Sequence, residues 1–171
     1  TDTAQTGQAA SASKGQQATQ SAAISGGDES QQADVLWQQA QSAFESGDWQ
    51  AAETLLLNLQ SIAPGYRTSE VKESLYTIYV NLAAAKDQTG ELELALTYVD
   101  KALELHPDET ALREARELAV DYLDVLTYSG ADFEREIEML ESLYVRNPGY
   151  RDVTERLRQA HIDLGEKLAD E

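Results

Sequence analysis

The sequence has no cysteine, so disulfide bonds, thiolate metal sites and cysteine nucleophiles are excluded. Proline occurs only three times and aromatic residues make up only 7% of the chain. No apolar run approaches the roughly 18–20 residues of a membrane-spanning helix, so we expect no membrane span. Ala, Leu and Gln dominate instead. These unbranched side chains lose little rotamer freedom in a helix, and the composition therefore favours an all-α fold.

Basic residues are also scarce. Thirteen Lys and Arg oppose 31 Asp and Glu, which gives a formal net charge of -18. Such a surface repels nucleic acid and anionic membranes, and no local basic cluster offsets the repulsion, so we expect no nucleic-acid partner. A basic partner is compatible with this charge but is not implied by it, since a solvated helical surface explains the same acidity.

Residues 1–32 form a low-complexity segment of Ala, Gln, Ser, Thr and Gly, in which Ile24 is the one large apolar residue. Because this segment can bury little apolar area, we expect it to be flexible or extended, with Asp28 or Ser30 capping the first helix after it. It is either a spacer to an anchor or an arm that assembles with another subunit. Its Ser and Thr density permits O-linked glycan on an exported chain.

A repeat follows from residue 33 onward. Its marks are three glycines, each followed by a proline 17, 17 and 18 residues later: Gly47 and Pro64, Gly90 and Pro107, Gly130 and Pro148. Twelve residues before each proline lies Ala52, Ala95 or Glu136. A left-handed turn is favourable at glycine and proline stops a helix, so each unit reads as two helices with a tight turn between them. The acidic residue that follows each glycine (Asp48, Glu91 and Asp132) is placed to cap the second helix or complement its dipole.

This pattern resembles the tetratricopeptide repeat (TPR). The second unit matches it best, through Tyr79, Leu82, Ala83, Gly90, Ala95, Val99, Ala102 and Pro107. The first unit departs at Gln39, and the third has Glu136 in place of a small residue and one extra residue near Gly130. The resemblance covers about residues 33–150 and implies a helical-hairpin solenoid with a right-handed superhelix.

The units recur every 40 to 43 residues, longer than the usual repeat of about 34. We therefore expect long first helices in the later units. The predicted pairs are 33–45 with 49–62, 68–88 with 92–105, and 108–129 with 133–146. Residues 151–171 supply a lone C-terminal helix at 152–168, as a cap or a docking helix. The segment Pro-Gly-Tyr-Arg at 64–67 returns 84 residues later at 148–151.

Residues for catalysis or cofactor binding are not recognisable. His106 and His161 have no ligand spacing, and we interpret the carboxylates of Glu136, Glu138 and Glu141 as solvated. No phosphate loop, nucleophile elbow or calcium loop occurs. We expect no enzymatic activity, no cofactor and no metal site.

The resemblance places the lining of the concave groove at Trp37, Gln41, Phe44, Val80 and Ala84. The third unit contributes Leu118 and Tyr122, or Glu117 and Asp121 in the shifted register. None of these residues is basic, so the Lys and Arg clamp by which some members of the family hold a C-terminal carboxylate is not expected here.

The sequence thus predicts a non-enzymatic protein–protein interaction scaffold. In one version it associates end to end as a homo-oligomer or filament, through the tail and the terminal helix, whose candidate docking residues are Val153, Leu157 and Leu164. The alternative is a monomeric peptide- or partner-binding adaptor anchored by the tail, or an accessory domain of a larger protein. The chain begins at Thr1 rather than at Met, which fits a processed export product, so we expect an extracytoplasmic or secreted protein.

Overall fold

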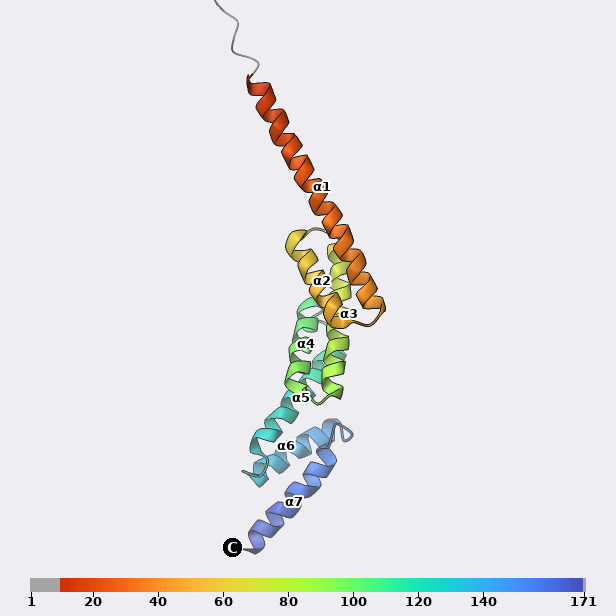
Figure 1. The fold of residues 1–171 in the computed structure, drawn as a ribbon. Coiled ribbons are helices and arrows are strands. Elements are labelled where there is room, and N and C mark those ends of the chain that lie inside the picture. Colours follow the sequence, from red (N-terminus) through yellow and green to blue (C-terminus); the bar gives the residue numbers. More distant parts are fainter. Residues whose placement is uncertain (1–9, 171) are drawn as a thin grey trace, which may run out of the picture. The chain divides into compact units, whose positions relative to one another are not determined.

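The chain is helical throughout the part that the structure describes. A computed structural model describes the backbone of residues 10–170 and the side chains of residues 28–170. Seven helices and no strand occur within this described backbone (Figure 1), which confirms the all-α class. In chain order the helices are α1 (Ala10–Glu45), α2 (Trp49–Ile62), α3 (Thr68–Gln88), α4 (Leu92–Leu105), α5 (Thr110–Tyr128), α6 (Phe133–Arg146) and α7 (Val153–Ala169).

Most helix boundaries follow the sequence signals. The ranges expected for α2, α3, α4 and α6 agree with those observed, and α5 and α7 begin and end within two residues of expectation. The carboxylate of Asp48 caps α2 by accepting the N–H of Ala51 at 3.1 Å. Asp132 caps α6 in the same way, from Arg135 at 3.0 Å. Glu91 makes no such cap. Two of the three acidic residues therefore cap their helix through the side chain, while Glu91 places its charge at the N-terminus of α4 without such a bond.

Helix α1 begins much earlier than expected. The sequence predicts a flexible or extended segment over residues 1–32, whereas the backbone of residues 10–32 is helical and continues into the predicted first helix. Residues 1–9 of that segment lie outside the described residues. Ala is the strongest helix former and Gln a good one, so a composition that cannot build a core can still form a helix. The glycines at positions 26 and 27 weaken this helix without ending it, since each costs about 1 kcal/mol.

The chain divides into two compact units, residues 1–82 and residues 83–171, and the boundary falls inside α3. In the first unit, α1 and α2 lie side by side as a hairpin (Figure 1). Apolar side chains on their facing sides are buried, namely Ala33, Ala40, Ala52, Leu56 and Leu59. Ala52 is 0% exposed, which agrees with its expected place at a close crossing of two helices.

In the second unit, α4, α5, α6 and α7 pack in chain order, each against the next. The buried core residues are Leu92, Ala119, Tyr122, Val125, Ile137, Leu140, Leu143, Val153 and Ala160. Every helix from α4 to α7 contributes to this cluster. The second unit therefore has a hydrophobic core of its own.

The three repeat glycines adopt the left-handed conformation that the sequence suggests. Gly47, Gly90 and Gly130 have φ values of 75°, 81° and 72°. Each follows a first helix and precedes a second one, at the tight turn of its hairpin. A side chain with a Cβ would be strained there, which explains why the repeat uses glycine at this point.

The Pro-Gly-Tyr-Arg turns before α3 and α7 also contain left-handed backbone, at an unusual residue type. Arg67 and Arg151 have φ values of 43° and 47°. A left-handed conformation costs a residue other than glycine about 1–2 kcal/mol, so contacts of the side chain must offset the strain. Each guanidinium lies 5.5 Å from the centre of an aromatic ring, Arg67 over Trp37 and Arg151 over Tyr122. Cation–π attraction at both turns supplies such a contact.

The structure contradicts the expectation that Glu136 is solvated. The sequence places its carboxylate on a solvated surface, but its side chain is buried at 5% exposure. The Oε2 atom accepts the backbone N–H of Gly130 at 3.1 Å, in the turn between α5 and α6. This turn is one residue longer than the others, through Ala131 or a neighbouring residue. A long acceptor at position 136 thus reaches the longer turn and satisfies one of its donors.

Candidate functional site

The expected groove residues are divided between the two units. Trp37, Gln41 and Phe44 lie in α1 and are partly buried, as is Val80 in α3, and all four belong to the first unit. Ala84 is exposed and belongs to the second unit. The structure therefore does not bring these five residues together within one compact unit.

The two aromatic residues of that set make contacts inside the first unit. The ring of Phe44 meets that of Trp49 edge to face, with 5.2 Å between the ring centres. Trp37 is covered by the guanidinium of Arg67, whose Nε donates a hydrogen bond to the Tyr66 hydroxyl at 3.3 Å. Both aromatic side chains thus contribute to packing within the hairpin and its following turn.

The expected docking residues of α7 face the core of their own unit. Val153 is completely buried and belongs to that core, while Leu157 and Leu164 are partly buried against it. The sequence places Val153 on a candidate docking surface, whereas the structure makes it a packing residue. The reason is that α7 packs against α6, which covers this part of its apolar stripe, while Leu168 near its end is 61% exposed.

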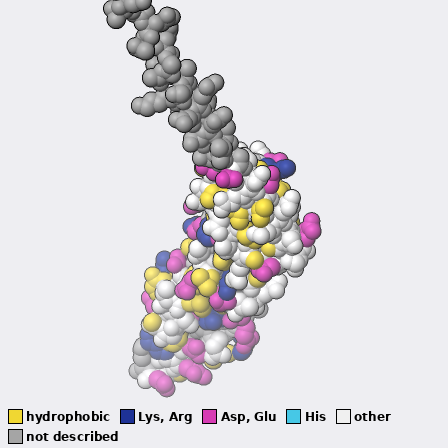
Figure 2. All heavy atoms as spheres, turned by 45° about the horizontal axis from the view of Figure 1, so that its top comes forward, with side chains coloured by type: hydrophobic (Ala, Val, Ile, Leu, Met, Phe, Trp, Pro, Cys, Tyr) yellow, Lys and Arg dark blue, Asp and Glu magenta, His cyan; other side chains and the backbone are white. Residues whose placement is uncertain are grey.

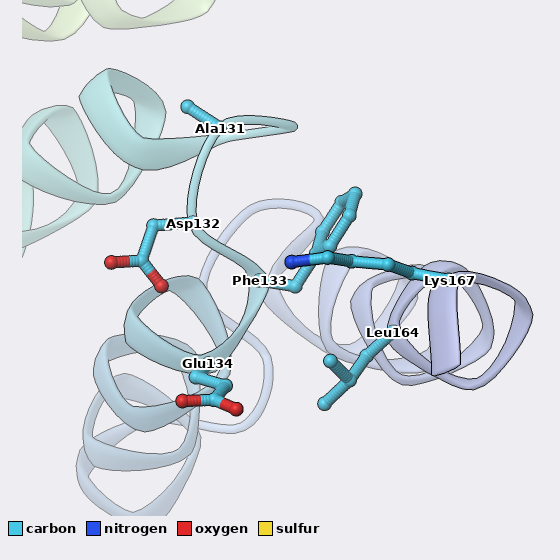
Figure 3. Close-up of a pocket in the computed structure, with 6 residues that line it drawn as sticks. All are labelled: Ala131, Asp132, Phe133, Glu134, Leu164 and Lys167. Atoms are coloured by element: carbon cyan, nitrogen blue, oxygen red, sulfur yellow. The ribbon is translucent and has the colours of Figure 1, made fainter. Parts of the chain in front are cut away.

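Leu164 also lines a shallow pocket of about 240 Å³ between the start of α6 and the second half of α7. Figure 3 shows Leu164, Phe133 and Lys167 on one side of this pocket and the carboxylates of Asp132 and Glu134 on the other. Polar groups dominate its rim. We regard it as a less suitable binding site than the groove described next, because it offers little apolar surface to an incoming side chain.

A groove of about 330 Å³ lies between the start of α4 and the second half of α5, with the turn before α7 at its edge. We call it the α4–α5 groove. It is lined by Gly90, Glu91, Leu92, Glu93, Tyr122, Leu123, Leu126 and Arg151. Three leucines and an aromatic ring give it an apolar floor, and Leu126 is still 38% exposed. Such a floor with a few charged groups at its rim is typical of a site that receives a side chain from a partner.

One wall of the α4–α5 groove is held by a network around Tyr122. The Tyr122 hydroxyl donates to a carboxylate oxygen of Asp152 and accepts from Nε of Arg156 at 3.2 Å. Arg156 also pairs with Asp152 at 3.0 Å. The ring of Tyr150 meets that of Tyr122 edge to face at 5.8 Å, and Arg151 covers its face. Tyr122 is thereby fixed on several sides, and the wall is preorganised.

The protonation states in this network favour its hydrogen bonds. Burial raises the pKa of the Tyr122 phenol, and its hydrogen bond to Asp152 raises that pKa further. Burial disfavours ionisation of Asp152, but the hydrogen bond from Tyr122 and the charge of Arg156 outweigh it and lower the pKa of Asp152. At neutral pH the phenol therefore remains a donor and the carboxylate remains an acceptor.

The charged groups at the rim differ in their internal partners. Glu91 pairs with Lys86 at 3.0 Å and accepts from the Thr89 hydroxyl at 2.8 Å. Arg151 pairs with Asp87. The carboxylate of Glu93 forms no hydrogen bond or ion pair with the described residues. Glu93 is therefore the rim charge that remains open to an incoming partner.

The groove positions expected in the third unit lie at two places. Tyr122 lines the α4–α5 groove. Leu118 and Glu117 line a separate depression of about 370 Å³ with Glu114 and Arg146. There Arg146 pairs with Glu117 at 3.3 Å and also with Asp121. Arg146 thus already pairs with two of the carboxylates at this depression, whereas that of Glu114 forms no ion pair with the described residues.

Most of the α4–α5 groove is not predicted by the sequence. Glu93, Leu126 and Arg151 are not among the expected groove residues, whereas Tyr122 is. A usable signal was present in the repeated Pro-Gly-Tyr-Arg segment, whose second copy places Arg151 against Tyr122. The apolar floor could not be predicted in this way, because leucines at helical spacing are equally typical of a buried core.

No cluster of His, Asp or Glu in the described part of the chain could hold a metal ion. Among the described helices, none is long and apolar enough to cross a bilayer. In comparisons with known proteins, no family model and no curated protein matches the chain.

Proposed function

We propose that the chain is a protein-binding adaptor built from TPR-like helical hairpins, and that the α4–α5 groove is its binding site. The observation that carries the proposal is a groove that leaves Leu126 partly exposed and whose wall is already fixed by the Tyr122 network. A preorganised site loses less conformational entropy on binding than one that must be ordered first. The groove therefore suits recognition of a partner's side chain.

Several features support the TPR-like architecture as part of this proposal. The repeat glycines lie at the predicted hairpin turns with positive φ. The small residues Ala52 and Ala95 are buried at 0% and 4% exposure, where the repeat pattern expects two helices to cross. The third unit departs at Glu136, and its contact with Gly130 accounts for that departure. The first two units thus keep both the glycine and the small residue of the pattern, and the third keeps the glycine.

The geometry favours the adaptor over end-to-end self-association. An end-to-end stack needs a continuous open apolar face on α7, but Val153, Leu157 and Leu164 pack on their own unit and only Ile162 and Leu168 of the helix are exposed large apolar residues. Two copies would also bring together two chains that each have a formal net charge of -18. Figure 2 shows acidic side chains spread over the presented face, with fewer basic ones among them. We therefore expect a monomer in light scattering at physiological salt, and a concentration-dependent increase in mass would contradict the adaptor.

A selection from a random peptide display library, with the full chain as bait, tests the proposed function. We expect enriched peptides whose binding shifts the backbone amide resonances of residues 90–93 and 122–126 in NMR spectra. The matched control is a Leu126→Ser variant, which should lose these shifts while keeping the parent's helical circular dichroism. If no peptide is enriched, or if the shifts map elsewhere, the α4–α5 groove is not the binding site.

A further inference from the structure

We infer that the α4–α5 groove binds a basic segment of a partner protein, in which a Lys or Arg lies next to one apolar anchor residue. This inference rests on the proposed function and specifies the chemistry of the partner. It combines the apolar floor with the distribution of charge around it. The anchor would occupy the space over Leu123 and Leu126, and the cation would meet Glu93.

The first support comes from the ion pairs that the basic residues of the second unit form. Six of its arginines form ion pairs inside the unit, namely Arg116, Arg135, Arg146, Arg151, Arg156 and Arg158. Lys86 is likewise paired with Glu91. Acidic residues outnumber basic ones by 31 to 13 in the chain, so carboxylates remain after this internal pairing. A basic partner can therefore pair with carboxylates that are otherwise neutralised only by solvent ions.

The second support is the place of one such carboxylate. Glu93 lines the groove beside Leu92 and has no internal partner among the described residues. Its neighbour Glu91 is already paired with Lys86 and accepts from Thr89, so the charge of Glu91 is compensated within the unit. The one cation that lines the groove, Arg151, is engaged by Asp87 and stacked on Tyr122. The open charge at the groove is therefore negative.

Other occupants fit these observations less well. A second copy of the chain would bring a net charge of -18 to a negative rim. An acidic segment would place like charges beside Glu93, which costs binding energy and specificity. An uncharged apolar segment would satisfy the floor but leave Glu93 without a partner. A basic segment with an apolar anchor satisfies both the floor and the rim.

The experiment uses synthetic peptides of one length in a Gly-Ser background, with binding to the full chain followed by fluorescence anisotropy. The first peptide carries Leu between two Lys residues, the second carries Leu between two Glu residues, and the third has Ser in place of Leu between two Lys residues. We expect measurable binding of the first peptide, with affinity at least about tenfold above that of the other two. Equal binding of the second peptide overturns the inference, and so does equal binding of the third.

Matched variants separate the groove from general attraction to an acidic protein. Glu93→Gln should weaken binding of the first peptide about two- to fivefold, whereas Glu104→Gln on the same helix should change it by less than about 1.5-fold. Leu126→Ser should weaken it at least about fivefold, whereas Leu57→Ser, at a similarly exposed leucine of the first unit, should leave it unchanged. All four variants change partly or fully exposed side chains, and melting curves check that each is folded.

The outcomes distinguish this inference from the proposed function. If Glu93→Gln and Glu104→Gln behave alike, the attraction is non-specific and the basic partner is refuted. If the display selection yields groove-binding peptides without Lys or Arg, the adaptor function is supported and the inference of a basic partner is refuted. If neither the library peptides nor the designed peptides bind, the adaptor function and the inference of a basic partner are both refuted. Peptide binding at concentrations where the chain self-associates would instead favour a second copy as the occupant.

Discussion

Replacing Glu136 by Ala should destabilise the chain, although Ala occupies the equivalent position in the two other repeats. The Glu136 carboxylate is buried and accepts the N–H of Gly130 at 3.1 Å. A hydrogen bond to a charged group contributes about 1.5–3 kcal/mol. Gly130 is itself exposed, so water can solvate its N–H in the variant, which favours the lower half of that range. We therefore expect a loss of about 2 kcal/mol.

Urea unfolding followed by circular dichroism measures this loss. In a chain of this size, about 2 kcal/mol corresponds to a fall of about 4–8 °C in Tm. The matched control is Glu138→Ala, because Glu138 is 71% exposed and pairs with Arg135 at the surface. That variant should stay within about 0.5 kcal/mol of the parent.

A compensating change sharpens the test. If Glu136 anchors the longer turn, deleting Ala131 in the Glu136→Ala variant should recover part of the lost stability, since the turn then has the length found in the other units. The reasoning is refuted if Glu136→Ala is as stable as the parent. It is also refuted if Glu138→Ala costs as much, because the effect would then come from removing charge.

Further predictions concern packing and pH. Ala95→Leu should overpack a helix crossing and cost about 1–3 kcal/mol, while Ala115→Leu at an exposed position of α5 should be neutral in the same thermal melts. The folded-state pKa of Asp152 lies below its ordinary value of 3.8, so its contribution to stability is present above that pH and is lost as the pH falls through the folded pKa. The stability difference between the parent and Asp152→Asn should therefore shrink as the pH falls from about 5 to below the folded-state pKa, which lies under 3.8. A difference that stays constant over this range would mean that the pairing of Asp152 with Tyr122 and Arg156 does not stabilise the fold.

The helices could be predicted because their signals are local. A glycine that favours a left-handed turn, an acidic cap and a closing proline lie within a few residues of the boundary that they set, as at Gly47, Asp48 and Pro64. The start of α1 could not be predicted in the same way. Residues 10–32 carry neither an apolar face nor a strong stop signal, and the balance between helix and extended chain depends on small propensity differences.

The α4–α5 groove could be predicted only in part, because it depends on contacts between distant segments. Arg151 reaches Tyr122 and Asp87 across 29 and 64 residues of sequence. Glu136 illustrates the same difficulty over a short distance. It lies only two and five residues from the exposed Glu138 and Glu141, and its place in the repeat and the longer turn before it distinguish it from them. Geometry decides which glutamate is buried.

The Pro-Gly-Tyr-Arg turns have a consequence for how the chain could have grown. They close the first and third hairpins, whereas the second hairpin is followed by Pro107, Asp108 and Glu109 and contains no such turn. The larger period is therefore two hairpins, or 84 residues. Duplication of a four-helix block explains this alternation more simply than repeated copying of one hairpin. An engineered chain lengthened by one such block would keep each stacked arginine opposite an aromatic ring, whereas insertion of half a block would place two unlike turns in the wrong order.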